Sequence, residues 1–136
     1  MGIDADVAKR AAEMYHLGES KLETAKKCTG SRKMYPDCVE LCYYAILYGI
    51  KAALAVDDAL PDSQEDAFAI FKEFHVGSEQ FPDECWKRLL AVLVLHEECV
   101  EKGYIPEVRE VETQVESAEY MLLLTNMFLG GKGVAL

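Results

Sequence analysis

The stretch Leu41–Val56, which reads LCYYAILYGIKAALAV, decides the fold, and Lys51 is its only charged residue. An apolar run of this kind predicts either a membrane span or a helix that is buried on nearly every side. Its 16 residues are fewer than the roughly 20 that a bilayer requires, and acidic segments flank it. We therefore interpret it as the central helix of a soluble helical bundle and expect no membrane association.

The composition fits one helix-rich domain. A chain of 136 residues can bury enough surface to fold alone, without disulfides or a structural metal. Of these residues 51% are hydrophobic and 28% are charged, and only 4 are prolines, which favours helix. We expect one domain over residues 1–136, with an ordered core over about 4–129.

The net charge of −10 makes a general nucleic-acid-coating surface unfavourable, because phosphate binding draws on clustered Lys and Arg. An acidic surface fits docking onto a basic partner protein instead. The five cysteines form no CxxC, and the first ten residues are polar rather than a signal peptide. We therefore expect a cytoplasmic protein whose cysteines pack as small apolar side chains.

Two small clusters each have an alternative interpretation. Cys38 and Cys42 share one helical face, but zinc would need two more ligands at matching places, so we predict packing, no metal and no other cofactor. A basic cluster surrounds the turn at Gly30 and is formed by Lys26, Lys27, Arg32 and Lys33. These cations either lie in a solvated loop near a helix C-terminus, where positive charge favours the helix dipole, or contact a phosphate group.

Helical spacing of apolar residues, with caps and breakers between the runs, predicts five helices and no strand. Gly18 lies inside the first helix and marks either a close approach of another helix or a bend. The predicted helices run from Asp4 to about Cys28, from Pro36 to about Val56, from a cap at Asp62 or Ser63 to about His75, from about Phe81 to Lys102, and from Glu107 to about Leu129.

The order of these elements resembles the HEPN family (higher eukaryotes and prokaryotes nucleotide-binding domain), especially its small stand-alone prokaryotic members. The resemblance spans about residues 4–129. It is carried by a first helix that ends in Lys26-Lys27, the central YYAILYGIKAAL pattern at 43–54, the FKEFHVGSEQFPDE segment at 71–84, and a closing helix that follows a Tyr-containing turn and ends in MFL.

The resemblance implies an all-α, antiparallel up-and-down bundle of four to five helices that forms a homodimer. Many family members pair with a nucleotidyltransferase in toxin–antitoxin modules. Others are metal-independent ribonucleases with an R-x(4–6)-H motif, in which Arg and His act on the scissile phosphate and the 2′-hydroxyl.

The family's catalytic pattern is incomplete in this chain. Stand-alone members usually carry an Arg ahead of an Ala-Asp-Tyr just before the last helix. The corresponding run, HEECVEKGY at 96–104, keeps Tyr104, lacks the Arg and has Gly103 where Asp is common. We therefore expect a non-catalytic or degenerate module that acts by binding a protein, a nucleotide or RNA.

Arg88 and His96 are the weak catalytic candidates. Seven residues separate them, which is outside the motif range, although a helical offset of eight places them on roughly one face. The alternative is an ordinary solvated Arg and a His near a helix end. Arg10 and His16 have the motif spacing, but they lie on the first helix about 120° from a common face, so we interpret that match as coincidence.

Four residues are candidates for ligand binding. Tyr44 and Tyr48 either stack on a ligand or belong to the core and an interface, and Tyr104 is the family tyrosine. Lys51 must pair, extend to solvent or contact a ligand phosphate, because an apolar helix gives a charge no other compensation.

Three hypotheses follow from the sequence. The first is a HEPN-type homodimer that binds a nucleotidyltransferase through apolar surface on the central and last helices. The second is a ribonuclease that uses Arg88 and His96, with Lys51 or Tyr104 in support. The third is a small-molecule-binding bundle with its pocket between helices.

Overall fold

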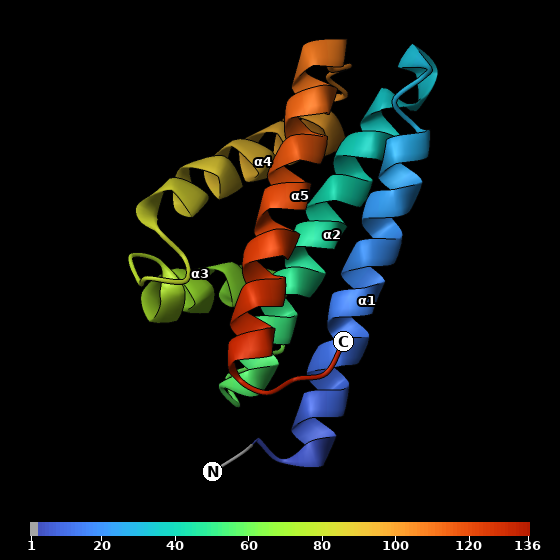
Figure 1. Cartoon of the computed structure of the whole chain (residues 1–136). Coiled ribbons are helices and arrows are strands. Elements are labelled where there is room, and N and C mark those ends of the chain that lie inside the picture. The colour runs from blue at the N-terminus through green and yellow to red at the C-terminus, as the bar shows by residue number, and fades with distance from the viewer. Residues whose placement is uncertain (1–2) are drawn as a thin grey trace.

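The computed structural model describes residues 3–136 and is an all-α bundle over that range. The predicted limits of the domain, 1–136, begin two residues outside it. Successive long helices reverse direction along the chain (Figure 1). The elements are α1 (Ala5–Lys27), the short 3₁₀ helix η1 (Arg32–Met34), α2 (Tyr35–Val56), α3 (Gln64–His75), α4 (Asp83–Lys102) and α5 (Val108–Gly131).

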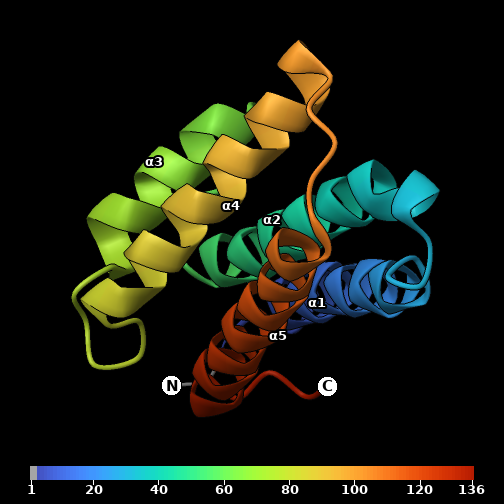
Figure 2. The same cartoon turned by 90° about the horizontal axis from the view of Figure 1, so that it is seen from above.

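Helix α2 is the centre of the bundle and packs against each of the other four α-helices. Thirteen of its 22 residues are buried. Helices α1 and α5 lie along it as a group of three, while α3 and α4 cover its other side (Figures 1 and 2). The prediction that Leu41–Val56 forms a core helix is therefore confirmed.

The helix that contains Leu41–Val56 is longer than its apolar core, so its length does not exclude a membrane span as the sequence suggested. Together, η1 and α2 form a continuous segment, Arg32–Val56, of 25 residues, which is long and apolar enough to cross a bilayer. Two thirds of its most apolar part (67%) is buried inside the bundle. Enclosure by the neighbouring helices, and not length, identifies this segment as a core helix.

Small residues allow three helices to approach closely. A Cβ added at Gly18 of α1 would lie 2.9 Å from the carbonyl oxygen of Ala45 in α2. A Cβ at Gly49 of α2 would lie 3.0 Å from a methyl group of Leu122 in α5. Gly18 therefore marks a close helix approach, which is one of the two alternatives that the sequence offers.

The helix ends follow the capping rules that the sequence suggests. Asp4 accepts a hydrogen bond from the Asp6 amide at 2.8 Å, and Ser63 caps α3 through the Asp66 amide at 3.1 Å. Gly103 ends α4 in the left-handed region, with φ of 65°, where a residue without a Cβ is favoured. Side-chain caps therefore fix where α1 and α3 begin.

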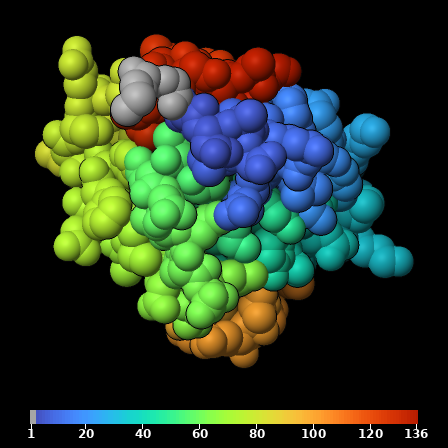
Figure 3. Space-filling view, turned by 90° about the horizontal axis from the view of Figure 1, so that it is seen from below, coloured from blue at the N-terminus to red at the C-terminus, as the bar shows by residue number. Residues whose placement is uncertain are grey.

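The ordered chain continues beyond the predicted limit at Leu129. Helix α5 ends at Gly131, and the amide of Val134 donates to the Leu129 carbonyl at 3.0 Å. Val134 is buried. The C-terminal segment lies beside the start of α1 (Figures 1 and 3). An apolar side chain after the glycines therefore holds the end of the chain against the bundle.

Candidate functional site

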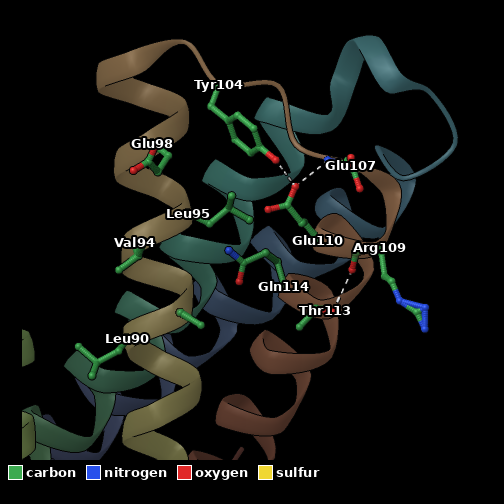
Figure 4. A pocket seen from close by; sticks show the side chains of 11 residues that line it. Leu90, Val94, Leu95, Glu98, Tyr104, Glu107, Arg109, Glu110, Thr113 and Gln114 are labelled. Atoms are coloured by element: carbon green, nitrogen blue, oxygen red, sulfur yellow. Dashed lines mark hydrogen bonds between the residues drawn. The ribbon is translucent and has the colours of Figure 1, made fainter.

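An open groove of about 830 Å³ lies between the second half of α4 and the first turns of α5 (Figure 4). Its α4 wall is formed by Leu90, Ala91, Val94, Leu95 and Glu98. These positions follow the spacing of one helix face. The opposite wall includes Glu110, Thr113 and Gln114 of α5, and Tyr104 closes one end.

The α4 wall is apolar although it faces solvent. Leu90 is 43% exposed and Val94 is 58% exposed. Both lie on the outward side of an amphipathic helix whose inward side carries Leu89 and Val92, which are fully buried. The sequence of α4 therefore supplies two apolar faces, and the bundle covers only one of them.

Gln114 gives the groove an unused hydrogen-bonding group. This side chain is only 3% exposed, and its Nε2 has no hydrogen-bond partner among residues 3–136. Its amide end points toward α4 in the groove (Figure 4). A buried amide without a partner costs about 1–3 kcal/mol, so an oxygen atom supplied to this position would stabilise the protein.

The upper rim of the groove is a network around the start of α5. The Tyr104 hydroxyl donates to Glu110 Oε1 at 2.6 Å. The same carboxylate accepts from the Glu107 amide at 2.9 Å, which completes a capping box. The hydrogen bond to Glu110 raises the pKa of Tyr104 to about 12. Tyr104 is therefore a neutral hydrogen-bond donor that positions the capping carboxylate.

The charged residues of the groove are mostly carboxylates. Glu98, Glu107 and Glu110 line it, and Arg109 is the only cation among its lining residues. The Arg109 side chain extends away from the apolar wall (Figure 4), and Glu98 pairs with Lys102 at 3.1 Å. The groove thus combines the apolar α4 wall with an acidic rim.

The two catalytic candidates face different helices. The guanidinium carbon of Arg88 lies 4.5 Å from the Tyr120 ring centre of α5, and Arg88 Nε lies 3.7 Å from Glu84. His96 instead stacks on Tyr43 of α2, with ring centres 3.8 Å apart and planes 5° apart. Within one protomer the structure does not bring these two side chains together on a common substrate position.

His96 has the environment of a packing residue. The edge of its ring also faces Tyr44, at 6.4 Å between centres. Burial lowers the pKa of His96, while the nearby Glu40 acts in the opposite direction. The side chain is therefore held in its neutral form, between two tyrosines.

The predicted ligand-binding residues are distributed over the bundle. Tyr44 belongs to the cluster around His96, and Tyr48 lies under Lys51, whose Nζ is 5.5 Å from the ring centre. That cation–π contact compensates the lysine charge. Lys51 belongs to the C-terminal part of α2, and α2 ends at the opposite end of the bundle from the turn between α4 and α5 (Figure 1). Of the four, only Tyr104 lines the α4–α5 groove.

Other chemistry-bearing groups do not assemble into a metal site. Within residues 3–136, no three His, Cys, Asp or Glu side chains are arranged to hold a metal ion. Cys38 and Cys42 are both fully buried, and the Cys38 thiol donates to the Ala25 carbonyl at 3.4 Å. His75 pairs with Asp57 and packs among three phenylalanines, Phe71, Phe81 and Phe128.

Sequence reasoning missed the groove and Gln114. The helical spacing of apolar residues predicted α4 but not that these residues divide into a buried row, with Leu89 and Val92, and an exposed row, with Leu90 and Val94. A count of apolar residues around the helix would have indicated the second face. Nothing in the sequence indicated that Gln114 would be buried without a partner.

Comparison with known proteins leaves the family unassigned. No protein-family model matches this chain, and no curated protein matches it significantly.

Proposed function

We propose that this protein is a non-catalytic HEPN-type module of the cytoplasm that forms a homodimer and acts by binding a partner protein, a nucleotidyltransferase in a toxin–antitoxin-like pair. The family proposal is supported by the order of the five helices and by the YYAILYGIKAAL pattern on the central helix α2. Nucleotide or RNA binding is the other activity that the resemblance implies.

The observation that carries the binding proposal is the α4–α5 groove. Exposed apolar side chains in a contiguous groove are typical of interaction sites. The acidic rim and the net charge of −10 favour a partner with a basic surface. A catalytic role is less well supported, because Arg88 and His96 stack on tyrosines of two different helices.

The surface expected to drive assembly needs correction on one point. The sequence suggested the central and last helices, but α2 is enclosed by the other four helices. Six of the twelve large apolar side chains that are exposed among residues 3–136 lie on α4 or α5, and Leu90, Val94, Leu123 and Met127 are among them. We therefore assign the partner-binding role to α4 and α5.

The proposal is tested by mixing this protein with a nucleotidyltransferase of the type encoded beside HEPN proteins and measuring comigration by size-exclusion chromatography. We expect a complex at micromolar concentrations that weakens with rising salt, because exposed charges are screened. Absence of comigration at these concentrations would refute the proposed partner. An RNA-cleavage activity that His96→Ala abolishes would refute the non-catalytic assignment.

A further inference from the structure

We infer that the α4–α5 groove is the docking site for an amphipathic helix of the partner protein, with apolar residues toward α4 and Lys or Arg along its borders. The inference rests on the proposed binding function and deepens it by naming the surface and the chemistry of the segment that fills it. It is carried by the shape of the apolar wall, the unpartnered amide of Gln114 and the charge of the rim.

The apolar wall has the dimensions of a helix contact. The apolar part of the α4 wall runs from Leu90 to Leu95, which is roughly 8 Å along the helix. Glu98 continues the same face one turn further and belongs to the acidic rim. A partner helix would lay about one and a half turns of its apolar face against this length, with anchors at spacings of three and four residues. The groove is open along its side, which suits a helix better than an enclosed small molecule.

Gln114 specifies a polar contact inside this apolar surface. Its Nε2 lacks an acceptor among the described residues, while the side chain is almost fully buried. A partner that offers a hydroxyl or amide oxygen, or a free carbonyl at the end of its helix, would satisfy this donor. The Gln114 side chain must rotate to present Nε2 at the groove surface, because that atom is itself enclosed. One oxygen acceptor is therefore expected among the apolar anchors.

The rim selects for a basic border and against a second copy of this chain. Glu98, Glu107 and Glu110 line the groove, and the cation Arg109 extends away from the apolar wall. The whole chain carries a net charge of −10. Placing another copy on this rim would bring like charges together, which opposes association.

The test is a selection from a displayed library of randomised helical peptides of about 15 residues against the intact protein. We expect enrichment of peptides with an apolar face and Lys or Arg on its borders. The binding of a synthetic enriched peptide is then measured on the wild type and on Val94→Glu. The substitution should weaken binding about tenfold or more, as expected for a central anchor position.

Val100→Glu is the matched control. Val100 has the same side chain on the same helix and is 61% exposed, against 58% for Val94, but it does not line the groove. It should leave peptide affinity within about twofold of the wild type, since surface substitutions away from a site change little. Equal loss in both variants would overturn the inference, as would enrichment of acidic peptides or no enrichment at all.

A second variant tests the role of Gln114 separately from folding. Gln114→Met keeps the length of the side chain and removes the unpartnered donor, so the melting temperature of the free protein should stay equal or rise. Affinity for the enriched peptide should fall severalfold. A lower melting temperature with unchanged peptide affinity would show that Gln114 serves the fold and would remove it from the site.

The outcomes separate this inference from the proposed function. If a nucleotidyltransferase complex forms and Val94→Glu leaves it intact, the groove is not the docking site, although the function holds. If peptides bind the groove and the nucleotidyltransferase does not comigrate, the partner is wrong and the groove stands. Stabilisation by ATP or GTP in a thermal-shift assay, lost in Val94→Glu but not in Val100→Glu, would overturn the inference in favour of a small-molecule site.

Discussion

At the scale of single residues, His96 illustrates how packing determines protonation. Its ring is stacked on Tyr43, and burial lowers its pKa. A His in the unfolded chain takes up its proton near pH 6.5, so the unfolded state binds protons more readily than the folded state. The stability that neutral His96 contributes is therefore complete above about pH 6.5 and is lost as the pH falls from there toward the folded pKa.

Replacing His96 by Phe should remove this part of the pH dependence while keeping an aromatic ring against Tyr43. We expect the free energy of unfolding of the wild type to fall more steeply between pH 7.5 and 5.5 than that of His96→Phe, because only the wild type has this proton to bind. Urea denaturation at several pH values measures both slopes. His16→Phe is the control, because His16 is exposed and contacts only the edge-on ring of Tyr15 and the carboxylate of Glu19. Parallel slopes for wild type and His96→Phe would contradict the prediction.

At the scale of elements, the contact between α1 and α2 depends on Gly18. Alanine there would gain up to about 1 kcal/mol of helix propensity, but its Cβ would lie 2.9 Å from the Ala45 carbonyl oxygen. Because that atom belongs to the backbone of α2, the two helices must move apart, at a cost of about 1–3 kcal/mol. We predict that Gly18→Ala lowers the free energy of unfolding.

Gly130→Ala provides the control for Gly18→Ala. Gly130 is also helical, but a Cβ there would meet nothing within 4 Å. It should be neutral or stabilising by up to about 1 kcal/mol. Chemical denaturation of both variants decides the matter. Stabilisation by both substitutions would mean that α1 and α2 tolerate a wider separation.

The start of α5 depends on a capping box that also forms the rim of the groove. Glu110 accepts from the Glu107 amide and from the Tyr104 hydroxyl. Glu110→Ala removes both bonds and should lower the free energy of unfolding by about 1 kcal/mol. Glu112→Ala, exposed on the same helix, should change it by less than about 0.5 kcal/mol. Equal effects in urea titrations would show that the box adds no stability.

At the scale of the whole molecule, the proposed homodimer needs an apolar contact outside the acidic groove. Leu123 and Met127 lie one turn apart on α5 and are 59% and 57% exposed. We predict that Leu123→Glu combined with Met127→Glu converts the dimer to a monomer in sedimentation velocity, because it places charges in an apolar contact. Val100→Glu should leave the dimer intact. A dimer that persists in the double variant would exclude this face of α5.

Most of the fold follows from local signals. The side chains of Asp4 and Ser63 cap the helices that they were expected to begin, and the observed ends of all five α-helices lie within about two residues of the predicted ones. Local rules suffice here because a cap or a glycine acts on its own helix end. The apolar run at 41–56 likewise predicted a buried helix, since a helix that is apolar on nearly every side must be covered by other elements.

The candidate site could not be found in the same way. Tyr104 was selected on a family resemblance and does line the groove, whereas Lys51, Tyr44 and Tyr48 lie elsewhere. Arg88 and His96 lie eight positions apart on one helix, which places their side chains about 80° apart around its axis. That difference is enough to turn one toward α5 and the other toward α2.

The sequence by itself determined the helical class, the five elements with their ends, and the choice of α2 as the core, because each depends on residues that are close together along the chain. Only the tertiary structure decided which apolar row of α4 is covered and which lines a groove. It also left the Gln114 amide buried without a partner and turned the Arg88 and His96 side chains toward different helices. These features depend on the positions of α4 and α5 relative to α2, and helix packing sets those positions through contacts between residues far apart in sequence.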